Sequence, residues 1–207
     1  MRNTTTPSDA ELLRLMAAGD DRAFTTLYRR HQGALYRFAL LMSGSAAVAE
    51  DVTQEAFLTL IREARSYDPA RGTLSAYLYG VARHRVLRYL ERERAHVPLL
   101  EEAEDGEAVP LITLLSRDDP FVDCMRQETS KLVRQAVLAL PPRYREVIVL
   151  CDLQDLSYAE AAAALGCAVG TISSRLCRGH ALLLERLRAL DKLNVAPPEA
   201  KSLRCLV

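Results

Sequence analysis

The sequence predicts an all-α protein made of two small helical domains joined by a flexible acidic linker. Tryptophan is absent and phenylalanine occurs only four times among the 207 residues. The cores must therefore be built mainly from Leu, Ala and Val, which favours helices over sheets. Apolar residues recur at helical spacing in both halves of the chain, whereas residues 97–120 interrupt this period with three prolines. These observations divide the chain into residues 1–96, a linker at 97–120, residues 121–190 and a tail at 191–207.

The first domain, residues 1–96, is predicted to contain four helices. Ser8 and Glu11 have the spacing of a capping box, which begins the first helix. The next two helices run from about 20 to 42 and from about 46 to 64. Thr73 can cap a fourth helix that extends to about residue 95. The predicted core positions of the third helix are Val48, Val52, Phe57, Leu60 and Ile61.

The second domain, residues 121–190, begins with a helix at about 121–139. Two prolines then start another helix, where a missing N–H costs nothing. Ser157 and Glu160 form a second capping box, which opens an alanine-rich helix that Gly166 can end. Its small side chains allow another helix to cross close by. A last helix covers about 169–189.

The net charge of zero hides an alternation along the chain. Residues 1–94 carry a net charge of +3, residues 95–120 carry −6, and residues 121–207 carry +3. Nearly all the cations are arginines, whose planar fork suits phosphate and carboxylate partners. The sequence therefore predicts two basic modules separated by an acidic linker.

The alanine-rich helix and the last helix have the spacing of a helix-turn-helix. Ala162, Gly166 and Ile172 supply its small, glycine and apolar positions, and such a motif places the start of its second helix in the major groove of DNA. A plain helical hairpin with a solvated arginine face fits the same pattern. The predicted outward-facing residues are Thr171, Ser173, Ser174, Arg175, Cys177 and Arg178.

The fourth helix interleaves arginines with tyrosines. Arginines follow phosphates and aromatic rings stack on unpaired bases, so this composition is typical of single-strand binding. The alternative is that the tyrosines are core residues and the arginines are solvated. The residues are Arg83, Arg85, Arg88, Arg92 and Arg94, with Tyr77, Tyr79 and Tyr89.

Several classes of protein are not indicated. The five cysteines are odd in number and form no CxxC pair, so no disulfide framework is expected. Cys151, Cys167, Cys177 and His180 lack the gaps of a zinc finger, and no histidine has a partner at catalytic spacing. We expect no catalytic residue, no metal, no cofactor, no export signal and no membrane insertion, and hence a cytoplasmic protein.

Longer stretches of the chain resemble the extracytoplasmic-function (ECF) sigma factors of the sigma-70 family. The stretch "LPPRYREVIVLCDLQDLSYAEAAAALGCAVGTISSRLCRGHALLLERL" (140–187) is similar to their helix-turn-helix domain. "DVTQEAF" (51–57) resembles the part that docks on the polymerase, and "YDPARGTLSAYLYGVARHRVLRYLERERA" (67–95) resembles their −10 promoter reader. The resemblance covers about 24–96 and 123–190.

This resemblance implies a sigma factor that binds core RNA polymerase and directs promoter-specific transcription initiation. The implied partners are the β′ coiled coil and the β subunit of the polymerase, promoter DNA and an anti-sigma factor. The implied polymerase-binding residues are Asp51, Gln54, Glu55, Phe57 and Leu58. The implied −10 residues are Tyr67, Arg71, Thr73, Tyr77, His84, Arg85 and Arg88, and the −35 residues are the six outward-facing residues of the last helix. The alternative is a helix-turn-helix regulator that acts without polymerase.

The chain departs from the family pattern on the −35 surface. Relatives often have a basic residue in place of Ser173, an aromatic or His in place of Cys177, and Ala-Arg in place of the pair at 179–180. We therefore expect a weak intrinsic −35 affinity or an unusual −35 sequence. In the first domain Leu74, Tyr77 and His84 replace an aromatic, tryptophan and asparagine.

Overall fold

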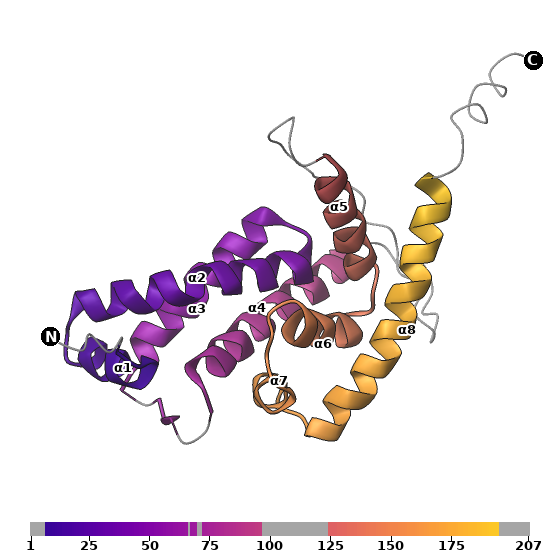
Figure 1. Cartoon of the computed structure of the whole chain (residues 1–207). Helices are drawn as coiled ribbons and strands as arrows, with labels where there is room; N and C mark the ends of the chain where they lie inside the picture. The colour runs from indigo at the N-terminus through magenta and orange to yellow at the C-terminus, as the bar shows by residue number, and fades with distance from the viewer. Residues whose placement is uncertain (1–6, 66, 70–71, 97–123, 195–207) are drawn as a thin grey trace, which may run out of the picture.

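The protein is all α-helical, as the sequence predicts. The computed structural model describes residues 7–65, 67–69, 72–96 and 124–194, and this part of the chain forms eight helices (Figure 1). The first half contains α1 (Asp9–Ala17), α2 (Asp21–Ser43), α3 (Ala46–Glu63) and α4 (Leu74–His96). The second half contains α5 (Cys124–Leu138), α6 (Pro142–Asp152), α7 (Tyr158–Leu165) and α8 (Val169–Asn194).

Both predicted capping boxes are present. The Ser8 hydroxyl accepts a hydrogen bond from the backbone N–H of Glu11 at 3.3 Å, and the Glu11 carboxylate accepts one from the Ser8 N–H at 2.8 Å. Ser157 and Glu160 repeat this arrangement at the start of α7. Gly166 ends α7 in the left-handed conformation, with φ 63°, which glycine adopts without a steric penalty. Local sequence therefore fixes these helix boundaries.

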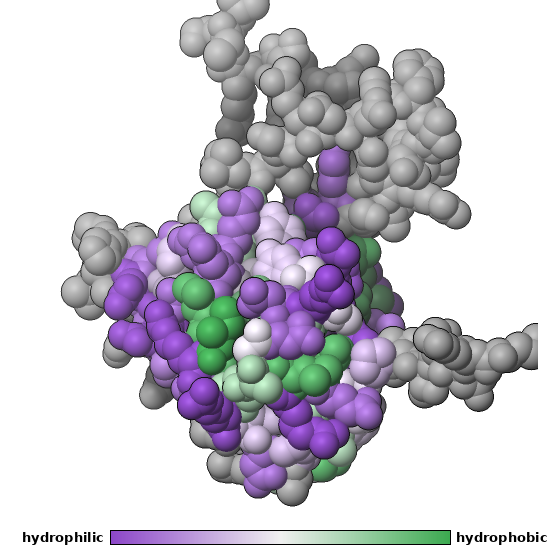
Figure 2. Space-filling view, turned by 90° about the vertical axis from the view of Figure 1, so that its left-hand side faces the viewer, coloured by the Kyte–Doolittle hydropathy of each residue, from purple (hydrophilic) through white to green (hydrophobic). Residues whose placement is uncertain are grey.

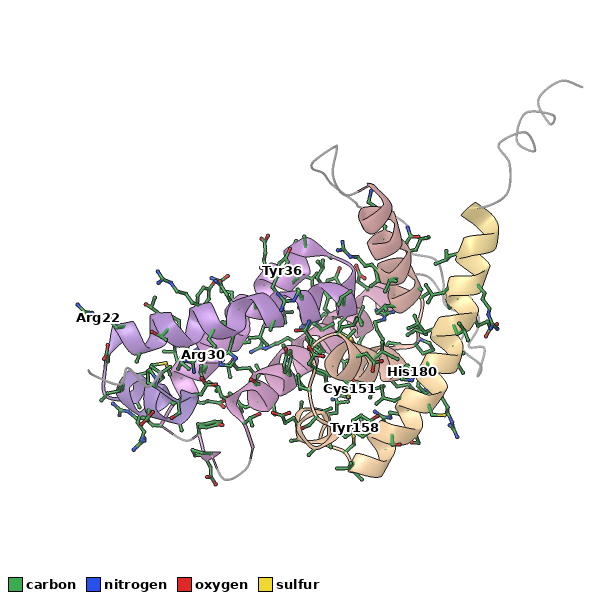
Figure 3. The ribbon with its side chains drawn as sticks, in the orientation of Figure 1. Arg22, Arg30, Tyr36, Cys151, Tyr158 and His180 are labelled. Carbon is green, nitrogen blue, oxygen red and sulfur yellow. The ribbon has the colours of Figure 1, made fainter. Side chains whose placement is uncertain are left out.

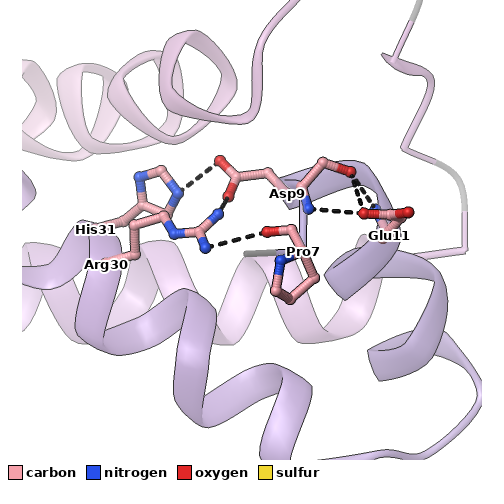
Figure 4. A network of polar contacts seen from close by, with 6 residues as sticks. Pro7, Asp9, Glu11, Arg30 and His31 are labelled. Carbon is pink, nitrogen blue, oxygen red and sulfur yellow. Dashed lines mark hydrogen bonds and ion pairs between the residues drawn. The ribbon is translucent and has the colours of Figure 1, made fainter. Parts of the chain in front are cut away.

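Polar contacts fasten α1 to α2 (Figure 4). The Asp9 carboxylate accepts a hydrogen bond from Nε2 of the buried His31 at 2.8 Å and also pairs with Arg30. Nη2 of Arg30 donates a further hydrogen bond to the Pro7 carbonyl at 3.1 Å. One carboxylate thus fixes the first helix against the middle of the second.

A single apolar cluster runs through both halves of the protein. Leu27, Phe38, Leu60 and Leu78 are fully buried where α2, α3 and α4 pack together, and residues 147–150 of α6 continue the same cluster. The prediction for Ile61 was wrong, because its side chain is 49% exposed. The buried face of α3 therefore includes Leu60 but not the neighbouring Ile61.

The two halves contact each other directly. Helix α4 of the first half packs across α7 of the second, and α2 contacts α5 and α6 (Figure 1). The alanine-rich α7 is therefore crossed by α4, a helix from the other half of the chain. The predicted linker at 97–120 and residues 195–207 of the predicted tail at 191–207 lie outside the described residues, whereas residues 191–194 belong to α8, and the domain boundaries stay predictions.

Candidate functional site

The outer face of α3 carries four of the five predicted polymerase-binding residues. Asp51 and Gln54 are exposed, and Glu55 and Leu58 are partly exposed, as their three- and four-residue spacing predicts. Phe57 differs, because only 2% of its surface is exposed. Its ring lies 4.7 Å from that of Tyr28, measured between centroids. Phe57 therefore lies beneath the exposed face of α3 and packs against Tyr28 instead of facing a partner.

A shallow groove between α2 and α3 adjoins this face. Its lining includes Tyr28 and Tyr36 from α2 and Gln54, Leu58 and Ile61 from α3. Tyr28 and Ile61 are the exposed apolar residues of this groove, at 37% and 49%. Figure 2 shows apolar patches among polar side chains at the end of the molecule formed by α1 and the adjoining ends of α2 and α3. Apolar surface rimmed by polar groups is typical of a protein-docking site.

Two tyrosines that the family resemblance assigns to −10 recognition form a pair at the start of α4, one from the segment before the helix and one from its first turn. The rings of Tyr67 and Tyr77 meet edge to face, with centroids 5.6 Å apart. The Tyr67 hydroxyl donates a hydrogen bond to the Gly72 carbonyl at 2.9 Å, and the Tyr77 hydroxyl donates one to the Glu63 carboxylate at 2.6 Å. Partial burial, reinforced at Tyr77 by this carboxylate, raises the pKa of both phenols. The pair thus holds Tyr67 and Gly72, which precede α4, close to Tyr77 in the first turn of that helix.

The remaining predicted −10 residues follow the start and the outer face of α4. Thr73 caps the helix by accepting a hydrogen bond from the Ala76 N–H at 3.2 Å. His84 and Arg88 are exposed one helical turn apart. Arg85 forms an ion pair with Glu55 of α3 at 3.2 Å, with both side chains about 40% exposed. This contact joins the predicted −10 surface to the predicted polymerase-docking face. Arg71 lies outside the described residues.

The predicted −35 surface is the start of α8. Ser173, Ser174, Cys177 and Arg178 are exposed there, and Thr171 is half-buried. Ile172, the predicted apolar position of the helix-turn-helix, and Leu176 are buried beneath them. This surface is dominated by small neutral side chains.

Arg175 does not lie on this open surface. It is half-buried, and its Nη1 donates to the Glu146 carboxylate of α6 at 3.0 Å. The same carboxylate pairs with Arg83 of α4, whose Nε lies 2.7 Å from Oε2. Only 2% of the Glu146 surface is exposed. The sequence analysis did not single out Glu146, although an acid that directly precedes the apolar run "VIVL" (147–150) on a buried helix needs a charged partner.

The cysteines and histidines do not form a metal centre in the described part of the chain. There, no group of three or more His, Cys, Asp or Glu side chains could hold a metal ion. His180 instead pairs with Asp152 at 2.6 Å. Burial, with a smaller effect of Asp152, raises the pKa of the Cys151 thiol to about 11. Figure 3 shows both Cys151 and His180 beside α6 and α8.

Comparison with known proteins identifies the family. Residues 27–96 match the model of Sigma-70 region 2, and residues 130–183 match that of Sigma-70, region 4. SigM of Mycobacterium tuberculosis, an ECF RNA polymerase sigma factor, is 36% identical over 187 residues, which are 89% of this chain and 87% of SigM. The chain belongs to the ECF sigma factors of the sigma-70 family.

Other ECF sigma factors show similar identity. SigW of Bacillus subtilis is 30% identical, with 83% of this chain and 92% of SigW aligned. SigE of Mycolicibacterium smegmatis is 34% identical over 83% of this chain, which spans only 65% of that relative. Region 2 thus covers most of α2 together with α3 and α4, and region 4 covers most of α5 through the first half of α8.

Two solved complexes share the fold of this sigma factor. CnrH in complex with the cytosolic domain of CnrY has a TM-score of 0.65 at 27% identity, covering 88% of this chain and 99% of the other. The sigma factor RpoE in complex with the anti-sigma factor NepR from Bartonella quintana has a TM-score of 0.63 at 25% identity, covering 80% and 96%. No helix in the described residues of this sigma factor is long and apolar enough to cross a membrane.

Proposed function

We propose that this sigma factor docks on core RNA polymerase through α3, captures melted −10 bases with α4 and the loop before it, and reads the −35 element with α8. One observation carries this proposal. The Glu55–Arg85 ion pair, at 3.2 Å, links a residue that we assign to the docking face with one that we assign to the −10 surface, which supports two adjoining sites. Docking on polymerase then positions the base-capturing residues at the site where the promoter must open.

Docking is assigned to the outer face of α3 and the groove beside it. Asp51 presents an exposed carboxylate, which suits an arginine-rich partner helix such as the β′ coiled coil, and Glu55 beside it can accept an arginine of that helix in place of Arg85. Leu58 and Ile61 offer apolar area that is only partly covered in the free chain. A buried apolar centre with a charged rim is the usual arrangement of a stable protein interface.

Capture of the −10 element is assigned to the tyrosine pair and the outer face of α4. Bases that leave the DNA stack gain about 1–3 kcal/mol each by stacking on an aromatic ring. The ring of Tyr77, with residues 67–69 and 72–73 beside it, offers such a surface. The exposed Arg88 can hold the strand by a phosphate, and Arg85 can do so when a phosphate replaces Glu55 as its partner. Thr73 and His84 lie along the same path, and we assign Arg71 there from the sequence alone.

Reading of the −35 element is assigned to the exposed start of α8. Ser173, Ser174 and Cys177 can approach base edges in the major groove, and Arg178 supplies a positive charge. Because Arg175 is paired with Glu146, the charge offered to the duplex is smaller than the sequence suggests. We therefore keep the prediction of a weak intrinsic −35 affinity, with the β subunit holding the second half in place.

We further propose that an anti-sigma factor controls this protein in the cytoplasm. The two similar solved chains were captured in complexes, one of them described as an anti-sigma factor complex. The acidic linker at 97–120 would pass through the polymerase. The alternative of a stand-alone regulator has no support in the relatives, which are polymerase factors.

The decisive experiment is in vitro transcription with core polymerase over a promoter library. We expect transcripts from a defined −10 and −35 combination only when both this chain and core polymerase are present. The Gln54→Ala/Leu58→Ala variant should lose transcription, and Leu15→Ala, an exposed apolar change on α1, should retain it. Promoter binding without any association with core polymerase would instead establish the stand-alone regulator.

A further inference from the structure

An acid–imidazole pair joins α8 to α6 within the second half of the chain. His180 of α8 lies beside α6 (Figure 3), and its Nε2 is 2.6 Å from Oδ2 of Asp152, the last residue of that helix. Both side chains reach solvent, with exposed fractions of 54% and 38%. Because ion pairs this open contribute little to stability, holding the two helices together does not by itself explain the pair.

His180 continues the exposed face of α8 that begins at Ser173. Residues spaced by four and three positions lie on one side of a helix, and Ser173, Cys177 and His180 have this spacing and are all exposed. At a rise of about 1.5 Å per residue, His180 lies about 10 Å further along α8 than Ser173. The major groove is about 8.5 Å deep, so a helix that starts in the groove brings His180 to the sugar–phosphate backbone at its edge.

The hydrogen bond to Asp152 determines what the ring of His180 can offer to DNA. A carboxylate accepts but does not donate, so Nε2 carries the hydrogen of this contact and Nδ1 is left for a second partner. In the neutral ring Nδ1 is then an acceptor, which a phosphate oxygen cannot satisfy. Only the imidazolium donates from both nitrogens. The ring can therefore join Asp152 to a phosphate only when it is protonated.

The charges around this ring give protonation a clear effect on DNA binding. Asp152 is the charged group that contacts it from α6, and Cys177 and Arg178 precede it on α8. Helices α5 and α7 also pack on α8, but the ionisable groups of their described side chains form no hydrogen bond or ion pair with His180: Lys131, Arg134, Tyr158 and Glu160. With a neutral ring the pair carries the charge of Asp152, which repels phosphates, whereas with the imidazolium the pair is neutral and donates a hydrogen bond.

We propose that His180 is a further −35-binding residue, that it contacts a DNA phosphate as the imidazolium, and that Asp152 positions its ring. This inference rests on the proposed function. Binding of the −35 element then takes up one proton from solvent. Because the DNA-bound state holds one proton more than the free state, promoter affinity rises as the pH falls through the range in which histidine gains its charge.

The promoter affinity of the assembled holoenzyme tests this inference. A labelled duplex that carries the −10 and −35 elements is titrated at about pH 6 and about pH 8, at constant ionic strength. We expect the wild-type protein to bind about fivefold more tightly at the lower pH. The slope of log affinity against log salt should also be steeper there by about one, because one more phosphate is neutralised.

His180→Arg is the matched control, because its charge is permanent and every other titrating group of the holoenzyme is retained. It should bind tightly at both pH values. His180→Gln cannot become a cation and should bind at both values as weakly as the wild type does at the higher pH. Asp152→Asn removes the carboxylate that faces the phosphates, so it should bind more tightly than the wild type at the higher pH and show a smaller pH response. Thermal unfolding checks that each variant is folded.

The same pH response in the wild type and in His180→Arg would overturn the inference, and so would a salt slope that does not change with pH. A loss of stability in His180→Gln with an unchanged pH response would show that the pair only joins α6 to α8. Failure of the proposed function is distinguishable, because the holoenzyme would then show no promoter-specific binding at either pH.

Discussion

Gly179 of α8 lies directly against Ile148 of α6. A Cβ added to Gly179 would meet Cγ1 of Ile148 at 3.2 Å and Cδ1 at 3.3 Å, and Ile148 is only 1% exposed. The structure thus gives a physical reason for glycine at a position where relatives often have alanine. The side chain of Ile148 occupies the space that such an alanine would fill.

The first prediction concerns this pair. Gly179→Ala should destabilise the chain by about 1 kcal/mol, because the buried Ile148 cannot move away and the clash outweighs the gain in helix propensity. In an Ile148→Ala background, Gly179→Ala should instead stabilise the chain, since the new methyl group enters the cavity left by the shortened side chain at position 148. Urea unfolding of both single variants and the double variant measures the coupling. Additive free energies would mean that the two residues do not interact.

The second prediction concerns polymerase docking. Replacing Gln54 and Leu58 with alanine should weaken binding to core polymerase by roughly 10- to 100-fold, as loss of central interface contacts usually does. Competition against a labelled reference sigma factor measures the affinity. Leu15→Ala removes an exposed apolar side chain from α1, outside the groove, and serves as the control. An equal loss in both variants would place the docking surface elsewhere.

The third prediction separates the two contributions of Tyr77 to promoter opening. Tyr77→Phe removes the hydrogen bond to Glu63 and keeps the ring, so open-complex formation should remain near the wild-type level. Tyr77→Ala removes the stacking surface and should reduce open complexes about tenfold or more, given about 1–3 kcal/mol for a stacked base. Permanganate footprinting of the −10 region detects the unpaired thymines. A defect in Tyr77→Phe that matches Tyr77→Ala would indicate that the loop geometry matters more than stacking.

The fourth prediction contrasts two arginines of α8. Arg178 is exposed, so Arg178→Ala should weaken promoter binding by the assembled polymerase and reduce the slope of log affinity against log salt by about one. Arg175→Ala should mainly lower stability, since it leaves Glu146 with Arg83 as its remaining partner in the triad. Binding titrations at several salt concentrations, with thermal unfolding of both variants, make the comparison. A salt slope lowered only by Arg175→Ala would mean that Arg175, and not Arg178, contacts the DNA phosphates.

The fifth prediction concerns alkaline pH. The pKa of the Cys151 thiol is raised to about 11, mainly by burial, from an unfolded value near 9. The folded state therefore favours the protonated thiol, and this contribution is fully present below pH 9 and lost as the pH rises towards 11. Cys151→Ala should lose less stability over that range than the wild type. Urea unfolding at several pH values checks this, with the exposed Cys177→Ala variant expected to unfold like the wild type.

Most of the helical architecture was predictable because its signals are local. Ser8 and Ser157 mark helix starts through the residue three positions later, and Gly166 marks an end through its own backbone preference. The outer face of α3 was also predictable, since side chains three and four residues apart share one side of a helix. Burial of Phe57 was predicted from its place in the apolar period, but the exposure of Ile61 was not, because only the packing of α2 decides which of these apolar residues is covered.

The sequence by itself determined the family, the order of the helices and the exposure of Ser173, Cys177 and Arg178. Each of these depends on residues that are close together in the chain. Only the tertiary structure decided that Arg175 turns to Glu146, and that Arg83 reaches the same carboxylate from the other half. The reason is physical: the desolvation of one buried charge is offset by partners 63 and 29 residues away, and no local pattern specifies such partners.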